Sequence, residues 1–374
     1  MKKIDNYIII TLFAGFLLFF SIWGLVQSDR EFSPNENRVL QQLPALSASS
    51  VLTGDYTEDF QRWQDDQFPL RDRWITLRTG LRLATGGRDL NGVYIGKDGY
   101  LIEKLTPEMM NREQFEKNLS AITAFRERLP KDIQMSVMIV PTTGAIMKDK
   151  LPDKATVFDE STFVSKSKQT LKNCGWIDLY GIFADEVKKG EQLYYRTDHH
   201  WTTKGAELAF TSWNPDVKLS SNRRVLSKDF HGSLFSKVLW GSAADVVEGY
   251  GLGDSRVTAD GKEIGSVYQD QFLDKKDKYA VFLGGNYGRT EIEAGKSRRR
   301  NLLIVKDSFA NCFAPYAMEA YDRVCLVDLR YFSGNLDAYI EENQITDVLV
   351  LYSMKNLIND KNLVVLKNEG SILS

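Results

Sequence analysis

The sequence predicts an α/β fold in which helices cover both faces of a mostly parallel β-sheet. Short apolar runs of strand length, such as residues 133–141 and 302–305, alternate with stretches in which apolar residues recur at helical spacing. This alternation is typical of parallel sheets, because each connection between parallel strands must cross over the sheet. The strand-length runs are apolar throughout, as expected of strands buried on both faces. Hydrophobic residues make up 43% and charged residues 26% of the chain, which is ordinary for a globular protein.

The first 27 residues depart from this pattern and predict a transmembrane anchor. An uncharged apolar stretch from Tyr7 to Gln27 follows the basic Met1-Lys2-Lys3. As a helix it would be about as long as a bilayer core is thick, near 30 Å, and the basic flank favours a cytoplasmic N-terminus. A secretory signal peptide is the alternative, but the residues after Trp23 lack the small-x-small cleavage pattern. We therefore expect a single-pass protein of the cell membrane with the bulk of the chain outside the cell.

Two further regions follow the anchor. Residues 28–90 begin as a polar, proline-containing stalk and continue into helical patterns at 57–63 and 70–83. Residues 91–374 carry the α/β pattern and are expected to form the main domain. Within this domain, residues 214–277 are rich in Gly, Ser and Asp and lack a long helical period, so we expect a β-rich insertion there.

Local signals place the elements of the main domain. Two apolar runs around an Asp-Gly turn predict a hairpin at 91–102, and a Thr-Pro-Glu start predicts a helix over 106–128. Residues 309–319 favour a helix that Pro315 interrupts. Further strands are expected at 133–141, 176–179, 279–283, 302–305, 324–329 and 347–352, and further helices at 160–171, 180–188 and 203–213.

Charge and cysteine content exclude several classes of function. The formal net charge is −2, so no global electrostatic field favours nucleic acid as a partner. The three cysteines show no CxxC spacing and their number is odd, which argues against a disulfide framework and against a typical zinc site. We expect neither a metal nor a cofactor.

A histidine pair marks the expected active site. The chain has three histidines, and two of them are adjacent in Asp198-His199-His200-Trp201. Histidine is the side chain that most readily exchanges protons near neutral pH. A serine nucleophile needs such a base, and the base needs a third group to orient it. Ser308 follows a short apolar strand, and residues i and i+2 of an extended loop point the same way, so Asp198 and His200 can face Ser308 together.

Each feature also has a simpler interpretation. Ser308 can be a helix N-cap, and the vicinal histidines can bind a metal, although no third or fourth ligand is indicated. Backbone N–H groups of Gly284-Gly285-Asn286 can contribute to an oxyanion hole, or the segment can be only a turn. Trp201 can contact substrate or belong to the core. The catalytic interpretation is favoured because these features coincide at predicted strand ends, where active sites of such sheets lie.

The segment Tyr195-Arg196-Thr197-Asp198-His199-His200-Trp201-Thr202 resembles the signature of the DHHW protein family. The resemblance covers most of the chain after the anchor and includes Phe282-Leu283-Gly284-Gly285-Asn286 and Lys306-Asp307-Ser308-Phe309. That family is similar to the SGNH hydrolase-like proteins of alginate O-acetylation, in which an Asp-x-His-Trp segment precedes a Gly-Asp-Ser segment. The resemblance implies an SGNH hydrolase-like domain with permuted motif order and the same Ser-His-Asp triad.

Two departures from the family pattern affect the site. Lys306 stands where the Gly-Asp-Ser segment of the alginate O-acetylation proteins has glycine, a difference expected to alter the turn before the serine and the oxyanion hole. The Gly and Asn blocks of SGNH hydrolases have no clear counterpart, so Arg330 and Tyr352, at later predicted strand ends, are positional candidates for oxyanion or substrate contacts.

The resemblance implies an extracytoplasmic serine acyltransferase that O-acetylates a cell-surface or exopolysaccharide glycan through an acyl-serine intermediate. A membrane-bound O-acyltransferase is the implied partner and acyl donor, and residues 7–27 would hold the chain at the membrane. Two alternatives remain open. One is a carbohydrate acetylesterase with the same triad, and the other is a non-catalytic glycan-binding or scaffold partner of the acyltransferase.

Overall fold

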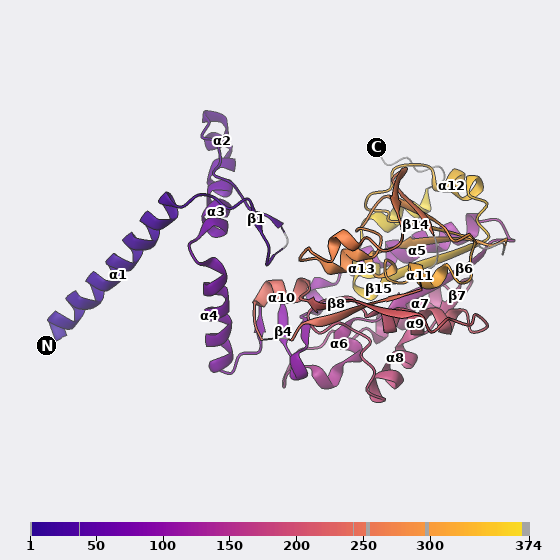
Figure 1. Cartoon of the computed structure of the whole chain (residues 1–374), viewed down its shortest axis with the longest axis horizontal. Coiled ribbons are helices and arrows are strands. Elements are labelled where there is room, and N and C mark those ends of the chain that lie inside the picture. Colours follow the sequence, from indigo (N-terminus) through magenta and orange to yellow (C-terminus); the bar gives the residue numbers. More distant parts are fainter. Residues whose placement is uncertain (1, 37, 242, 252–254, 296–298, 369–374) are drawn as a thin grey trace. The chain divides into compact units, whose positions relative to one another are not determined.

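The computed structural model describes residues 2–36, 38–241, 243–251, 255–295 and 299–368, which fall into two compact units (Figure 1). The first unit comprises Met1–Gly87 together with Ser236–Trp240, and the second comprises Arg88–Phe235 and Gly241–Ser374. The second unit contains the eight-stranded sheet and every residue of the predicted active site.

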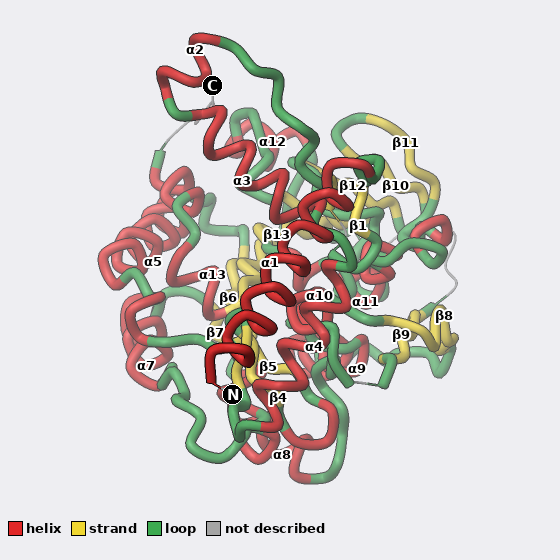
Figure 2. The backbone as a smooth tube through the Cα atoms, turned by 90° about the vertical axis from the view of Figure 1, so that its left-hand side faces the viewer, coloured by secondary structure: helices red, strands yellow, loops and turns green. Residues whose placement is uncertain are grey.

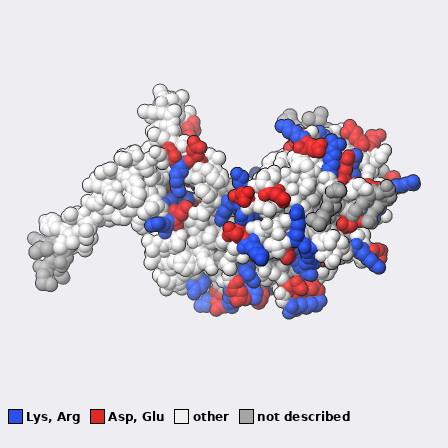
Figure 3. All heavy atoms as spheres, viewed as in Figure 1, with Lys and Arg blue, Asp and Glu red and all other residues white. Residues whose placement is uncertain are grey.

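The first unit is mainly helical. Its segment Asn6–Val26 has a mean hydropathy of 2.4, and its most apolar window has no buried residue. Figure 3 shows this helix without charged groups over its described side chains. By length and composition it can cross a membrane, either as a signal sequence or as a single anchor. The helices predicted at 57–63 and 70–83 are confirmed as α3, which extends further at both ends, and α4, which is shifted by one residue. The elements are α1 (Lys2–Val26), β1 (Phe32–Ser33), β2 (Arg38–Val39), α2 (Ala48–Thr53), α3 (Asp55–Gln67) and α4 (Arg71–Ala84).

The main sheet of the second unit is mixed, with a parallel half and an antiparallel half. Its strand order is β11-β10-β12-β14-β13-β15-β6-β7. The five strands from β14 to β7 run parallel, and β12, β10 and β11 extend the sheet in antiparallel fashion. The α/β prediction is confirmed, and the antiparallel half refines the expected mostly parallel sheet. The strands are β6 (Gln134–Val140), β7 (Gly175–Ile177), β10 (Arg256–Ala259), β11 (Lys262–Gly265), β12 (Arg289–Glu293), β13 (Asn301–Lys306), β14 (Arg323–Val327) and β15 (Asp347–Ser353).

Helices cover both faces of the parallel half. Successive side chains of a strand point to opposite faces, so in β13 Leu302 and Ile304 join one buried cluster and Leu303 and Val305 join the other. Figure 2 shows α5, α7 and α13 on one side of these strands and α9 and α11 on the other. The helices of this unit are α5 (Arg112–Arg128), α6 (Thr143–Ile146), α7 (Ser161–Thr170), α8 (Leu179–Lys188), α9 (Thr203–Trp213), α11 (Ala314–Ala317), α12 (Leu336–Glu342) and α13 (Met354–Asn359), and α10 (Ser233–Val238) spans the boundary of the units.

Two small sheets complete the second unit. The predicted hairpin at 91–102 is confirmed as β4 (Val93–Ile95) and β5 (Leu101–Glu103), with β3 (Asp89–Leu90) beside it. Within residues 214–277, β8 (Arg223–Phe230) and β9 (Asp245–Tyr250) form a two-stranded sheet of their own, whereas β10 and β11 extend the main sheet. Residues 242 and 252–254 of this region lie outside the described residues.

One predicted strand and two predicted helices differ in the structure. The helix expected over 106–128 begins only at Arg112, with Asn111 as its N-cap, and the Thr-Pro-Glu segment leads into a separate 3₁₀ turn, Pro107–Met109. Residues 279–283 were expected as a strand but contain the 3₁₀ helix Lys278–Val281, followed by Leu283 and Gly284 at positive φ, 64° and 80°. Two consecutive left-handed residues turn the chain and cannot continue a strand. Residues 309–319 form a short 3₁₀ turn, Ser308–Ala310, and the four-residue α11, in which Pro315 occupies the first turn, where no intrahelical N–H bond is lost.

Candidate active site

Ser308 lies at the carboxyl end of β13, on a turn that its neighbour Asp307 holds in place. The Asp307 carboxylate accepts a hydrogen bond from Phe309 N (3.0 Å), and its second oxygen accepts from Ser353 N and from Asn356 Nδ2, both at 2.8 Å. These bonds join the end of β13 to the end of the adjacent β15 and the start of α13. Asp307 is almost fully buried whereas Ser308 is half-buried, so the aspartate fixes the turn and leaves the serine accessible.

A second buried aspartate shapes the loop that carries the histidines. Tyr194 and Trp201 pair across this loop as an isolated β-bridge. The Asp245 carboxylate, at the start of β9, accepts hydrogen bonds from Arg196 N (2.9 Å), Thr197 N (2.8 Å) and Thr197 Oγ1 (2.7 Å). Burial raises the pKa of Asp245, partly offset by these bonds.

Trp201 ties the histidine loop to the serine turn. Its indole Nε1 donates to the carbonyl oxygen of Phe309 at 2.9 Å, and the side chain is fully buried. The sequence left open whether Trp201 contacts substrate or belongs to the core. The structure places it in the core, where it holds the two halves of the site together.

Ser308, His200 and Asp198 form one hydrogen-bonded chain. His200 Nε2 lies 2.7 Å from Ser308 Oγ, and His200 Nδ1 lies 2.6 Å from Asp198 Oδ1. A carboxylate accepts only, so Nδ1 carries a proton and Nε2 is left to accept the serine proton. Asp198 and His200 are 4% and 6% exposed, which shields these bonds from water. The arrangement is that of a serine nucleophile, a base and an orienting carboxylate.

The Asp198 carboxylate is held in its charged form. Burial alone would raise its pKa, but nearby His199 and His200 and two backbone N–H groups lower the pKa well below its ordinary value. Those backbone donors are His200 N at 3.0 Å and Ser233 N at 2.7 Å. Asp198 therefore stays ionised at neutral pH, as the stabilisation of an imidazolium requires.

Tyr279 contacts both His200 and Ser308, and the sequence analysis did not single it out. Its ring stacks on His200 with centroids 3.9 Å apart and planes 9° apart, and its hydroxyl donates to Ser308 O at 3.0 Å. Tyr279 lies in the segment that the sequence analysis predicted as a strand. In the structure this segment is a 3₁₀ helix, and this conformation places the tyrosine ring beside His200.

The Gly284-Gly285-Asn286 turn lies against the serine turn. Asn311 Nδ2, three residues after Ser308, donates to Gly285 O at 3.1 Å. Gly284 and Gly285 have positive φ angles of 80° and 129°, a region that L side chains rarely adopt. The structure thus brings the predicted oxyanion segment beside the serine turn.

The remaining positional candidates, Arg330 and Tyr352, differ in accessibility. Arg330 is partly exposed and binds the fully buried Asp328 through two hydrogen bonds, at 2.8 and 2.5 Å. Tyr352 is fully buried in the core, and its hydroxyl has no hydrogen-bond partner within the described part of the chain. Its side chain is therefore not exposed to a substrate at this surface.

A small cavity of about 80 Å³ lies next to the triad. His199, Phe309, Ser353, Lys355 and Glu103 contribute to its lining, and the last two form an ion pair at 2.8 Å. The His199 ring lies 3.9 Å from that of His200 between centroids, and its Nδ1 bonds Ser233 Oγ at 2.8 Å. Desolvation, followed by the neighbouring His200, lowers the pKa of His199 to about 4, so this ring is neutral at pH 7.

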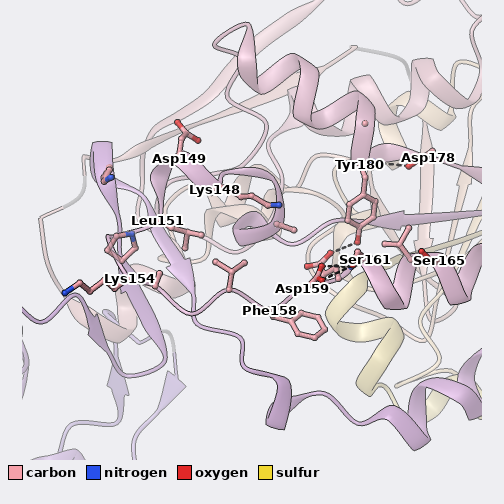
Figure 4. A pocket seen from close by; sticks show the side chains of 18 of the residues that line it. Lys148, Asp149, Leu151, Lys154, Phe158, Asp159, Ser161, Ser165, Asp178 and Tyr180 are labelled. Atoms are coloured by element: carbon pink, nitrogen blue, oxygen red, sulfur yellow. Dashed lines mark hydrogen bonds between the residues drawn. The ribbon is translucent and has the colours of Figure 1, made fainter.

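A larger pocket of about 780 Å³ lies elsewhere on the second unit, between the loop 148–160 and helices α7 and α8 (Figure 4). Buried Glu160 bonds Thr142 and Tyr180 at its edge, and burial raises the pKa of this carboxyl. Neither cavity is lined by a triad residue, but His199 and Phe309, the chain neighbours of His200 and Ser308, line the small one, so the greater size of this pocket does not make it the catalytic centre.

Asp198, His199 and His200 also meet a geometric condition for a metal site, since one ligand atom of each lies within 4.8 Å of the others. Both Asp198 oxygens and both His200 nitrogens already have hydrogen-bond partners. A metal at this cluster would have to break the chain to Ser308, whereas acyl transfer uses these atoms as they stand.

Comparisons with known proteins find distant similarity to proteins that are named for O-acetylation. A family model described as the SGNH hydrolase-like domain of acetyltransferase AlgX matches residues 93–220. Proteins named probable alginate O-acetylase AlgJ are similar, one from Azotobacter vinelandii (25% identical over 213 residues, 56% of this chain and 52% of the relative) and one from Pseudomonas syringae pv. tomato (28% over 220 residues, 56% and 51%). The chain spans about half the length of these curated relatives.

Solved structures show the same fold. A DHHW family protein from Eubacterium siraeum aligns with a TM-score of 0.64 at 24% identity, covering 76% of this chain and 97% of that protein. PatB1 of Bacillus cereus with a sulfonyl adduct aligns with a TM-score of 0.57 at 18% identity, covering 73% and 97%.

Proposed function

We propose that this chain, a distant homologue of the DHHW and AlgJ–AlgX group of SGNH hydrolase-like O-acetylases, is a serine acyltransferase that O-acetylates a cell-surface polysaccharide. The homology supports polysaccharide O-acetyltransferase activity in general. The observation that carries the proposal for this chain is the hydrogen-bonded chain from buried Asp198 through buried His200 to the accessible Ser308, at the carboxyl end of β13.

The first half of the reaction forms an acyl-serine. Ser308 Oγ attacks the carbonyl carbon of the acyl donor while His200 Nε2 takes the serine proton. Asp198 stabilises the imidazolium, which then returns the proton to the leaving group as the carbon–leaving-group bond breaks. The second half reverses these roles, because a sugar hydroxyl attacks the acyl carbon, its proton passes to His200, and Ser308 recovers the proton as the ester forms on the sugar.

The acceptor is proposed to approach through the small cavity beside His199. The cavity is lined by the neutral His199 imidazole, the Lys355 ammonium and the Glu103 carboxylate, which offer both donors and acceptors to sugar hydroxyls. Transfer requires that this hydroxyl reach the acyl-serine before water does. The acyl donor is proposed to be a membrane-bound O-acyltransferase, with this chain acting outside the membrane.

Intact-mass spectrometry of the full chain in detergent micelles tests this proposal. The protein is mixed with an activated acetyl ester and quenched early, and the expected product carries one added acetyl group on Ser308. Ser308→Ala and His200→Ala should remove the adduct, and Ser165→Ala, an exposed serine of α7, should keep it. An adduct at another residue, or one that survives in Ser308→Ala, would exclude an acyl-Ser308 mechanism.

Two further arms separate the alternatives. Adding acceptor oligosaccharide should convert the acyl-enzyme to acetylated sugar, whereas a carbohydrate acetylesterase would release acetate at the same rate with or without acceptor. A chelator should leave acylation unchanged, since no step uses a metal. A folded protein that never acylates, yet binds glycan, would indicate the non-catalytic scaffold instead.

A further inference from the structure

Lys306, the last residue of β13, is a buried cation two positions before the nucleophile. Its side chain is 2% exposed, and its ammonium lies 2.8 Å from Asn286 Oδ1, 2.8 Å from Asn311 Oδ1 and 3.6 Å from Asp328 Oδ2. Burying an ammonium costs free energy unless such partners compensate. A charge kept in a buried position beside the nucleophile therefore suggests a role in the site.

The ammonium decides how the Asn286 amide is oriented. A lysine ammonium only donates hydrogen bonds, so the amide oxygen and not the nitrogen must face it. Asn311 Nδ2 also donates to Asn286 Oδ1, at 3.3 Å. The Nδ2 group of Asn286 is therefore directed away from both donors. Asn286 is exposed, and its Nδ2 has no acceptor among the residues that the structure describes.

This oriented donor belongs to a turn that touches the serine turn. Asn311 N donates to Ser308 O at 3.2 Å, while its side chain bonds Gly285 O at 3.1 Å. Asn311 thus bridges the serine turn and the turn of Asn286. The positive φ of Gly285 allows the chain to bend there without a side chain in between.

We propose that Lys306 is a positioning residue, which locks the Asn286 amide so that its Nδ2 donates to the oxyanion formed at the acyl carbon on Ser308. The inference rests on the proposed acyl-serine chemistry. Stabilisation of a developing oxyanion requires donors that are already oriented before the reaction. In this chain the Lys306 ammonium supplies that orientation through its hydrogen bond to Asn286 Oδ1.

Charged groups around Lys306 set the pH range in which its side chain is protonated. Burial is the main cause that lowers its pKa, to about 8. Asp328 and Asp307 oppose this shift, and Arg330 adds to it. Below that value the charged ammonium bonds are roughly twice as strong as neutral ones. Above it the lock on Asn286 weakens, so the acylation rate is expected to fall as the pH rises through about 8.

A double-mutant cycle on the full chain in detergent tests the proposal, with acylation of Ser308 by an activated acetyl ester as the readout. Asn286→Ala is expected to slow acylation about 10²-fold, the loss typical of one oxyanion donor, and Lys306→Met about tenfold or more. Because Lys306 acts through Asn286, the double variant should be no slower than Asn286→Ala within about twofold. Lys262→Met, an exposed lysine of β11, should acylate at the wild-type rate.

Lys306→Arg gives a second test, the pH dependence of acylation, which should not change if Lys306 only stabilises the fold. Arginine keeps its charge across this pH range, so this variant should acylate well and lose the decline above pH 8. Multiplying effects in the double variant, or an unchanged rate in a folded Lys306→Met, would overturn the role of Lys306 alone. No acyl-Ser308 in the wild-type protein would instead overturn the proposed function, and this role with it.

Discussion

Asp198 is the residue on which the geometry of the candidate triad depends most directly. One of its oxygens accepts hydrogen bonds from the ring and the backbone of His200, and the other accepts the N–H of Ser233. A carboxylate accepts on both oxygens, whereas an amide offers one acceptor and one donor. An asparagine here must turn its NH₂ group toward one of these N–H donors, and it lacks the charge that stabilises an imidazolium.

Asp198→Asn is therefore expected to slow the acylation of Ser308 by about 10³- to 10⁴-fold. The rate is measured from early-quenched samples by intact mass, with the melting temperature as a check on folding. Asp229→Asn changes an exposed carboxylate of β8 and should acylate like the wild type. Near-normal acylation by a folded Asp198→Asn would remove Asp198 from the mechanism.

Asp198→Asn is also expected to lower the stability of the fold by an amount that depends on pH. The pKa of Asp198 is lower in the folded protein than in the unfolded chain. Its contribution to stability is therefore fully present above the ordinary aspartate pKa of about 4 and is lost as the pH falls below it. The difference in melting temperature between wild type and Asp198→Asn should be constant from pH 7 to 5 and shrink toward pH 3. A difference that grows at low pH would contradict the depressed pKa.

At the scale of elements, the loop between β8 and α10 must approach the histidine loop closely. Gly232 lies so near Asp198 that a Cβ on the glycine would overlap the aspartate side chain, whose position sets that of His200. We expect Gly232→Ala to destabilise the fold by about 1–3 kcal/mol through overpacking and to lower acylation per folded molecule. Gly181→Ala, where α8 leaves open space, should do neither. Chemical denaturation and acylation of both variants check this, and a fully active Gly232→Ala would show that Asp198 tolerates displacement.

Local sequence patterns predicted most strands of the sheet and also the three residues of the candidate triad. The Asp-x-His spacing and the serine after an apolar strand are visible within a few residues, so Asp198, His200 and Ser308 could be named from the sequence. β10 and β11 fall within the region expected to be β-rich, but their connection to the main sheet through β12 was missed, because β10 and β12 have four and five residues and pair across segments distant in sequence.

The hydrogen-bond network around Lys306, by contrast, could not be predicted from the sequence. The network joins three segments of the chain, which carry Asn286, the pair Lys306 and Asn311, and Asp328, and no periodicity links them. Lys306 itself was noticed only as a departure from glycine. What it contacts depends on how three turns pack at the end of the sheet, which a local pattern does not encode.

For the molecule as a whole, helix α1 is the feature that bears on localisation. Large apolar side chains such as Phe13, Leu17 and Leu18 are exposed along it. Such a continuous apolar surface is unfavourable in water and favourable in a bilayer. A signal sequence and a permanent anchor both have such an apolar surface. They differ in whether the helix stays attached to the protein.

We expect the full chain to stay in the membrane, with α1 intact. In bacteria expressing it, the protein should resist alkaline carbonate extraction, and its mass should include the first 27 residues. Arginine at both Leu17 and Leu18 adds about 2.5–3.5 kcal/mol each to the cost of insertion, so this variant should be lost from the membrane. Arginine at Leu46, an exposed apolar residue outside the helix, should not change localisation. A shorter protein that begins after α1 and is released outside the cell would instead identify the helix as a cleaved signal sequence, and acyl transfer would then require a soluble enzyme to meet its membrane partner by diffusion.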